Sequence, residues 1–231
     1  MTLASATGHS RPRIVVVSPH LDDAVFSLGA WIAHRARAGD DVVIVTVFAA
    51  DPTSAAPAGE WDRLCGFETS GAAARARREE DRRACVLVGA EPRWLDFSDE
   101  QYGDHNESLV WDALRPHLEG ARVLVPGFPL AHIDHRWLAH LVLARLEPGV
   151  QIGLYLEQPY AAASTGATGS WLRLPSGHRD RASKRRASAA YRSQMRLLRG
   201  KMRRVAIVEA VRSRESVCWV EGPAAGMALL R

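Results

Sequence analysis

The chain has 231 residues, of which 47% are hydrophobic and 24% are charged. This length and apolar content are sufficient for one α/β domain with a full core, and no stretch reaches the roughly 18 apolar residues of a membrane span, so no membrane partner is expected. The net charge of +4 comes almost entirely from arginines spread along the chain, since only two of the 30 basic residues are lysines. Such dispersal indicates a compositional bias rather than a nucleic-acid surface, so no nucleic-acid partner is expected.

The cysteines and the first residues bear on the cellular setting. Cys65, Cys85 and Cys218 are odd in number and widely spaced, so they predict neither a disulfide framework nor a CxxC zinc site. Cys85 falls in a helical pattern and is expected in the core. Residues 1–12 are polar and lack the apolar segment of a signal peptide, which predicts a disordered leader followed by a single domain over 13–231. We therefore expect a cytoplasmic, reducing environment.

Strand-like and helix-like segments alternate along the chain. Short apolar runs predict strands at 13–17, 42–48, 94–97, 123–125, 152–156, 205–208 and 217–220. Helical spacing of apolar residues predicts helices at 23–37, 73–88, 107–118 and 136–146, and a basic helix over 179–204 with a solvated charged face that includes Lys184. Stretches rich in Ala, Gly, Pro and Ser predict long loops at 49–72 and 161–180. The alternation predicts a Rossmann-like three-layer α/β sandwich with a mostly parallel sheet.

A polar turn lies between the first predicted strand and the first predicted helix. It places His20, Asp22 and Asp23 at a helix N-terminus, where free backbone N–H groups favour negative charge. One interpretation is structural, with Asp22 as the helix cap and Asp23 as a first-turn acid. The other is chemical, because His20 and Asp23 lie three residues apart across a turn and offer donors that suit a zinc-like ion. Asp22 would then be free to act on a bound water.

A second polar cluster follows the strand predicted at 123–125. It contains His132, Asp134 and His135, so two of the nine histidines of the chain fall within four residues. A cap by Asp134 on the following helix is the structural alternative. Open α/β sheets bind ligands beyond the carboxyl ends of their strands, where the strand order reverses. If the first and fourth strands are neighbours there, the two clusters face each other, and we expect a metal site at the C-terminal ends of these strands.

Both clusters resemble motifs of one enzyme family. Residues 19–24 read Pro-His-Leu-Asp-Asp-Ala and resemble the Pro-His-Pro-Asp-Asp-Glu motif of the LmbE-like zinc-dependent N-deacetylases, the PIG-L family. Leu21 and Ala24 are the two departures from that motif. The cluster at 132–135 resembles the family's His-x-Asp-His motif. Looser similarities, such as the Arg77 and Glu80 pair on a helix, extend the resemblance over roughly 13–194.

The resemblance implies a mononuclear hydrolytic site. His20, Asp23 and His135 would bind Zn²⁺, or alternatively Fe²⁺, and would leave positions open for water and substrate. The metal would lower the pKa of its water and polarise the acyl oxygen. Asp22 would act as the general base and return the proton to the leaving amine. This arrangement suits amide hydrolysis.

Further residues are assigned to catalysis and substrate binding. The resemblance matches His132, when protonated, to the histidine that stabilises the oxyanion, and Asp134 to an acid that orients a histidine. Asp99 lies where the family has an acidic loop lining the sugar site. Trp61 and Trp171 fall in the two long loops, where exposed aromatic rings would stack on a sugar or an acyl chain. The alternative for both tryptophans is that they pack onto the core and fix the loops.

These observations predict an enzyme that removes an N-acetyl or related N-acyl group from a small amino-sugar-containing molecule, in secondary-metabolite or thiol-cofactor biosynthesis. Two alternatives stay open: another metal-dependent amidase acting on a larger acyl or thiol conjugate, and a non-catalytic binding protein. A metallo-β-lactamase-like site would need a histidine where Leu130 stands. A dinucleotide site would need a glycine-rich turn after the first strand, and a serine hydrolase would need a GxSxG motif.

Overall fold

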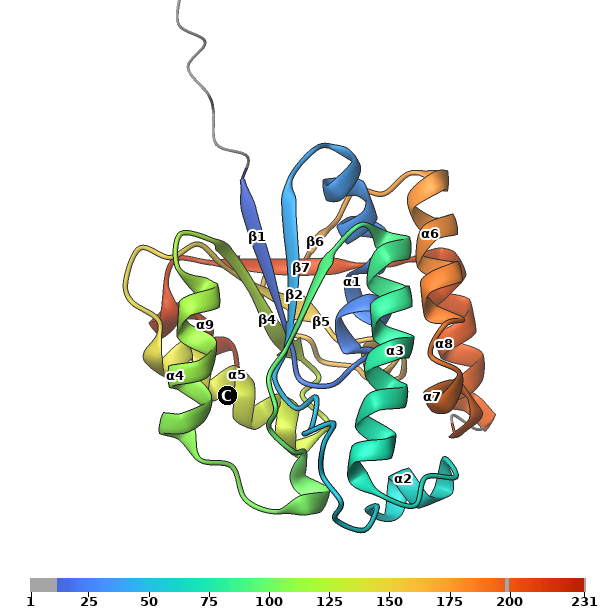
Figure 1. Ribbon diagram of the computed structural model, residues 1–231. Helices are drawn as coiled ribbons and strands as arrows, with labels where there is room; N and C mark the ends of the chain where they lie inside the picture. Colours follow the sequence, from blue (N-terminus) through green and yellow to red (C-terminus); the bar gives the residue numbers. More distant parts are fainter. Residues whose placement is uncertain (1–11, 198–199, 231) are drawn as a thin grey trace, which may run out of the picture.

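The computed structural model describes residues 12–197 and 200–230, which form a seven-stranded sheet between two layers of helices (Figure 1). The strands are β1 (Arg13–Ser18), β2 (Asp41–Thr46), β3 (Glu91–Trp94), β4 (Arg122–Phe128), β5 (Ile152–Leu156), β6 (Leu172–Arg173) and β7 (Ser216–Val220). Their order in the sheet is β3-β2-β1-β4-β5-β7-β6, and β7 and β6 are the antiparallel additions to five parallel strands. The predicted mostly parallel α/β sheet is confirmed, and the predicted leader at 1–12 lies outside the described residues except for Pro12.

Helices cover both faces of the sheet (Figure 1). One layer contains α1 (Asp23–Arg37), α3 (Ser70–Val88), α6 (His178–Ser188), α7 (Arg192–Leu197) and α8 (Gly200–Arg212). The other layer contains α4 (Glu107–Leu118), α5 (Ile133–Arg145) and α9 (Pro223–Leu229). A short helix, α2 (Glu60–Leu64), and two 3-10 turns, Glu100–Tyr102 and Tyr160–Ala163, lie in the connections. In the described part of the chain, no helix is long and apolar enough to cross a bilayer.

The central strand β1 shows why the parallel strands are continuous apolar runs. Ile14 and Val16 pack in the core cluster beneath α1 and α3, whereas Val15 and Val17 pack in the cluster beneath α4 and α5. All four side chains are fully buried. Successive side chains of a strand point to opposite faces, so a strand covered on both faces must be apolar at every position.

The C-terminal third differs most from the sequence prediction. The strand predicted at 205–208 is wrong, because these residues lie within α8. Ala206, Glu209 and Ser213 are buried at spacings of three and four, while Ile207 and Val208 are adjacent and exposed, which is a helical pattern. The β-branched residues favoured a strand, but packing against α6 and α1 selects a helix.

The basic segment 179–204 is also not one helix. It is divided among α6, α7 and the start of α8. Lys184 does not lie on a solvated face as predicted: its side chain is 1% exposed and its Nζ donates to Glu215 Oε1 at 2.7 Å. A charged residue is buried only where a partner compensates it, and here the partner lies 31 residues away in sequence.

Element boundaries near the loops also shift. The predicted loop 49–72 contains α2 and the start of α3, which begins at Ser70 because Thr69 Oγ1 accepts the Ala72 N–H at 3.2 Å. The other loop, 161–180, contains β6 and the start of α6. β3 precedes the predicted 94–97, and α5 begins three residues before 136. α3 ends at Gly89, whose φ of +76° is the left-handed conformation of a helix C-cap.

Candidate metal centre

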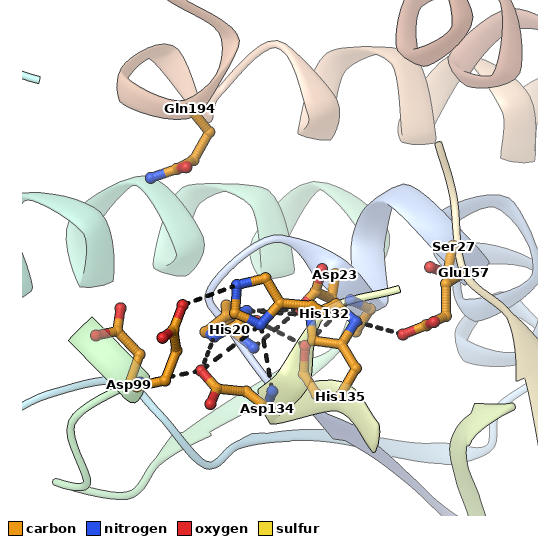
Figure 2. Close-up of polar contacts among 12 residues, drawn as sticks. His20, Asp23, Ser27, Asp99, His132, Asp134, His135, Glu157 and Gln194 are labelled. Atoms are coloured by element: carbon orange, nitrogen blue, oxygen red, sulfur yellow. Dashed lines mark hydrogen bonds and ion pairs between the residues drawn. The ribbon is translucent and has the colours of Figure 1, made fainter. Parts of the chain in front are cut away.

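The polar clusters meet where the strand order of the sheet reverses. β1 pairs in parallel with both β2 and β4, so the chain continues toward opposite edges from this point. His20 and Asp23 follow β1, whereas Asp134 and His135 follow β4, and Figure 2 shows these four side chains gathered together. The two strands are neighbours as predicted, and their C-terminal turns face each other.

The turn after β1 is built so that its two aspartates have different roles. Ser18 Oγ accepts the Ala24 N–H at 3.1 Å, and Asp23 Oδ2 accepts the His20 N–H at 2.9 Å. Asp22 occupies the N-cap position of α1, but within the described residues its side chain makes no capping hydrogen bond. Ser18 therefore satisfies one N–H of the first turn of the helix, and Asp22 lines the pocket above the turn.

Three donor atoms form a nearly equilateral triangle at this meeting point. His20 Nδ1 lies 3.1 Å from His135 Nε2 and 3.3 Å from Asp23 Oδ2, and His135 Nε2 lies 3.1 Å from Asp23 Oδ2. Tetrahedral ligands at about 2.0–2.1 Å from a zinc ion lie about 3.3 Å from one another. The triangle thus has the dimensions of one face of such a site, and the donor set of two imidazoles and one carboxylate suits the ion.

A second layer of hydrogen bonds orients these donors. His135 Nδ1 is hydrogen-bonded to Glu157 Oε1, and Glu157 Oε2 accepts the Leu130 N–H at 2.7 Å. His20 Nε2 lies 2.9 Å from Asp134 Oδ2, whose other oxygen is 2.7 Å from His105 Nε2. Each imidazole in the triangle thus has its other nitrogen on a carboxylate, the arrangement that fixes ring orientation and raises basicity in metal sites.

The buried carboxylates of this cluster favour positive charge on the neighbouring groups. Burial alone lowers the pKa of His20, but hydrogen bonds to Asp134 and Asp23 outweigh it and raise the pKa to about 9. Burial also lowers the pKa of His135, and the charge of Asp23 with hydrogen bonds to Asp23 and Glu157 raises it to about 11. Buried carboxylates therefore hold protons on both imidazoles, in the place where a divalent ion would supply the positive charge.

Asp22 has a different environment from its neighbour. Burial and then the negative charge of Asp23 raise the pKa of Asp22 to about 7. In contrast, burial raises the pKa of Asp23, but the charge of His135 prevails and leaves it well below its usual range. Two adjacent carboxyl groups thus have separated pKa values, which is the pattern of an acid–base group beside a permanently ionised one.

His132 lies at the start of α5, beside the triangle. Its Nδ1 accepts the Asp134 backbone N–H at 3.3 Å, so the proton of the neutral ring is assigned to Nε2. Burial and then the charges of His20 and His135 lower the pKa of His132. One ring nitrogen from each of His20, His132 and His135 lies within 4.8 Å of the other two, so His132 also belongs to a second possible donor set.

A pocket of about 560 Å³ opens above the turn after β1. Of the residues predicted to bind substrate, Trp61 and Asp99 line it. Trp61 is 41% exposed, and its Nε1 donates to Gln194 Oε1 at 3.1 Å. Among the residues that the structure describes, Trp171 is not part of this lining: its ring packs on the core cluster beneath α4 and α5, and its Nε1 donates to Thr168 O at 2.8 Å.

Two residues of the site had no assigned role in the sequence analysis. Glu157 follows β5 and reaches His135 because β5 pairs with β4. His105 lies in the connection between β3 and α4 and stacks on Phe48, with ring centroids 4.3 Å apart. A carboxylate directly after a buried strand was a usable signal for Glu157, whereas His105 had none, because its contact depends on the path of a loop.

Comparison with known proteins adds independent findings. The family model PIG-L, described as GlcNAc-PI de-N-acetylase, matches residues 15–146. A 2′-N-acetylparomamine deacetylase of Streptomyces fradiae is 32% identical over 172 residues, which are 65% of this chain and 58% of that protein. The match therefore spans less than two thirds of that relative's length.

Solved structures of similar fold cover nearly the whole chain. An antimicrobial pseudoaglycone deacetylase superposes with a TM-score of 0.78 and 26% identity over 92% of this chain and 99% of that one. A deacetylase of the teicoplanin biosynthesis pathway gives a TM-score of 0.76 and 28% identity over 90% and 96%. A zinc-inhibited form of a teicoplanin deacetylase gives a TM-score of 0.77 and 26% identity over 90% and 97%.

Proposed function

Since the chain belongs to the PIG-L family, we propose that it is a metal-dependent deacetylase that removes an N-acetyl group from an amino sugar. The observation that carries the proposal is the donor triangle of His20, Asp23 and His135 with an uncommitted Asp22 beside it. The Streptomyces relative and the antibiotic-pathway deacetylases support a substrate from secondary metabolism.

The ion would be held by His20 Nδ1, Asp23 Oδ2 and His135 Nε2. Zn²⁺ fits this donor set, and Fe²⁺ is the alternative, since imidazole and carboxylate suit both. When bound, such an ion supplies Lewis acidity, which lowers the pKa of water and polarises the amide carbonyl. Glu157 holds the His135 ring from its other nitrogen, and Asp134 does the same for His20.

Asp22 would move the proton. Its carboxylate lines the pocket, and its pKa of about 7 matches the pH at which a general base works best. It would accept the proton of the attacking water and return it to the amine nitrogen as the C–N bond breaks. Asp23, whose pKa is low, would stay ionised throughout.

His132 would stabilise the negative charge that develops on the carbonyl oxygen. Because its Nδ1 accepts a backbone N–H, its Nε2–H is free to donate to that oxygen. Burial lowers the pKa of His132, which favours the neutral ring as this donor. The proposal of a neutral donor differs in this respect from the protonated His132 of the sequence analysis.

Two measurements test the proposal together. Elemental mass spectrometry of the purified protein should find about one zinc or iron per chain, and the His135→Ala variant, folded by circular dichroism, should have lost it. The loaded protein should release acetate from at least one member of a panel of N-acetylated amino sugars. A folded, metal-supplemented protein that binds no ion would refute the site, and a loaded protein that cleaves no panel member would refute the activity.

A further inference from the structure

Building on the proposed function, we propose that the substrate is a polyamino sugar, which carries at least one protonated amine besides its N-acylated nitrogen. The inference concerns the rim of the pocket, which carries Glu60, Asp99 and Glu100, rather than the floor where the metal ligands lie. Within the described residues, this lining offers mainly negative charge and hydrogen-bond acceptors. A ligand rich in donors and positive charge is therefore the chemical complement.

Five carboxylates line the pocket: Asp22, Asp23, Glu60, Asp99 and Glu100. The first two serve the metal and the proton transfer. In the parts of the chain that the structure describes, neither Glu60 nor Asp99 forms an ion pair, and Glu100 Oε1 approaches only the weakly basic His132, at 3.8 Å. Three carboxylates thus remain for the substrate.

The arginine in the pocket lining already has an ion-pair partner outside the lining. Arg77 is its single lysine or arginine among the described lining residues, and the Nη2 of Arg77 is ion-paired with Asp62 Oδ1, while its buried Nε has no hydrogen-bond partner there. Asp62 is 3% exposed and lies beneath the pocket wall, where Tyr102 also donates to it at 2.6 Å. The positive charge of Arg77 is therefore compensated by Asp62 and does not balance the negative charge of Glu60, Asp99 and Glu100.

Three buried acceptors of the lining residues, on Gln158, Asp99 and Gln101, have no partner among the described residues and point to a missing donor. Gln158 is 5% exposed, and its Oε1 has no hydrogen-bond partner among the described residues. Asp99 Oδ1 is likewise buried without a partner there, although Oδ2 accepts from Gln101 Nε2 at 2.7 Å. Buried acceptors are nearly always satisfied, so ligand donors are expected to complete this set.

An ammonium group supplies both the positive charge that the carboxylates lack and the hydrogen-bond donors that the buried acceptors lack. An ammonium offers three donors and no acceptor, and a sugar hydroxyl offers one donor beside it. The contrast with the rest of the protein is informative, because a chain of net charge +4 presents a locally acidic pocket. Such a pocket concentrates cations and repels phosphorylated sugars. The pocket volume of about 560 Å³ lies within the range of sites that enclose small-molecule ligands.

The test compares three N-acetylated sugars that differ at one position, where they carry a hydroxyl, an amine or a phosphate. We expect kcat/KM for the amine to exceed that for the hydroxyl about tenfold, with the phosphate the poorest, and the advantage to shrink as salt screens the rim. Glu60→Gln should reduce the advantage about threefold, through KM rather than kcat. Calorimetry of the deacetylated products should give the same order of affinity without turnover.

Glu119→Gln is the matched control, because Glu119 is an exposed partner of Arg115 at the end of α4. This variant should keep the full preference for the amine. Equal hydrolysis of the amine and hydroxyl sugars, or a preference unchanged in Glu60→Gln and in high salt, would overturn the inference and leave the deacetylase proposal intact. Failure to hydrolyse any of the three and any panel sugar would refute the proposed function, and this inference with it.

Discussion

Two clusters of buried charge contact α1 and have different consequences. The open cluster, at the N-terminus of the helix, contains His20, Asp23, His105, Asp134, His135 and Glu157. The sealed cluster, beside the middle of the helix, is the ion pair of Lys184 and Glu215, both 1% exposed. Glu215 also accepts the backbone N–H groups of Ala30 at 2.9 Å and Trp31 at 2.7 Å.

The two clusters differ in how far their negative charge is neutralised by positive groups of the protein. In the sealed cluster one cation meets one anion, and further hydrogen bonds occupy the carboxylate, so the charge is neutralised within the protein. In the open cluster, three carboxylates surround the imidazoles of His20 and His135 and keep both protonated, and the cluster adjoins the pocket. Burial of charge by itself thus does not identify a site. Uncompensated charge beside a cavity does.

The largest effect is expected for Asp22→Asn, which tests the open cluster as chemistry. Asparagine cannot accept the proton of the attacking water, so kcat should fall about 10³-fold. Metal content should be unchanged, because the three donor atoms belong to other residues. Steady-state kinetics with metal analysis would check both. Retention of kcat within a few-fold of the parent would remove Asp22 from the mechanism.

Lys184→Met tests whether the ion pair of the sealed cluster stabilises the fold. The change leaves Glu215 buried without its cation, and removing one member of a buried pair costs about 3–5 kcal/mol of the free energy of unfolding. Chemical denaturation would measure it. Arg185→Met is the matched control, because Arg185 is the exposed neighbour on α6 and its loss should change stability by less than about 0.5 kcal/mol. Equal stability of the two variants would show that the pair is dispensable.

Glu157→Gln tests whether a carboxylate of the open cluster supports a metal ligand. The amide keeps the shape of the side chain but removes the charge behind His135, so metal affinity should fall about 10–100-fold. Competition with a chelator would measure the affinity, and a thermal melt would show whether the fold is retained. An unchanged affinity would mean that the carboxylate does not support the ligand.

The charge compensation by protons predicts a pH dependence. With pKa values of about 9 for His20 and about 11 for His135, the metal-free cluster holds protons at pH 7. Metal binding requires neutral imidazoles, so binding should release at least one proton per ion, and affinity should rise about tenfold per pH unit for each proton released, up to about pH 9. Calorimetry in buffers of different ionisation enthalpy would count the protons. Binding without proton release would contradict the compensation argument.

Trp61→Ala carries the smallest expected effect. If the exposed ring stacks on the substrate, KM should rise about threefold, by the loss of roughly 0.7 kcal/mol, with kcat retained. Val86→Ala is the control, since Val86 is 67% exposed on α3 and does not line the pocket among the described residues. An unchanged KM would assign Trp61 to fixing α2 against Gln194 instead.

The sequence was informative where chemistry and topology coincide. His20, Asp23 and His135 were identifiable because each follows a buried parallel strand, and the reversal of strand order brings their turns together. Glu157 also follows a buried strand, but its contact with His135 depended on the pairing of β4 with β5, which no local pattern states. The burial of Lys184 depended on a partner 31 residues away, so a cation in a basic segment was assigned to the surface.

The position of the open cluster has a consequence for how this protein could change. All six of its residues lie outside 49–72, the segment that supplies Glu60, Trp61 and Leu64 to the pocket lining. This part of the substrate-facing wall is therefore separate in sequence from the catalytic floor, whereas Asp99, Glu100 and Gln158 supply other parts of the wall. A graft of segment 49–72 from a relative that takes a different sugar should shift substrate preference while metal affinity is conserved.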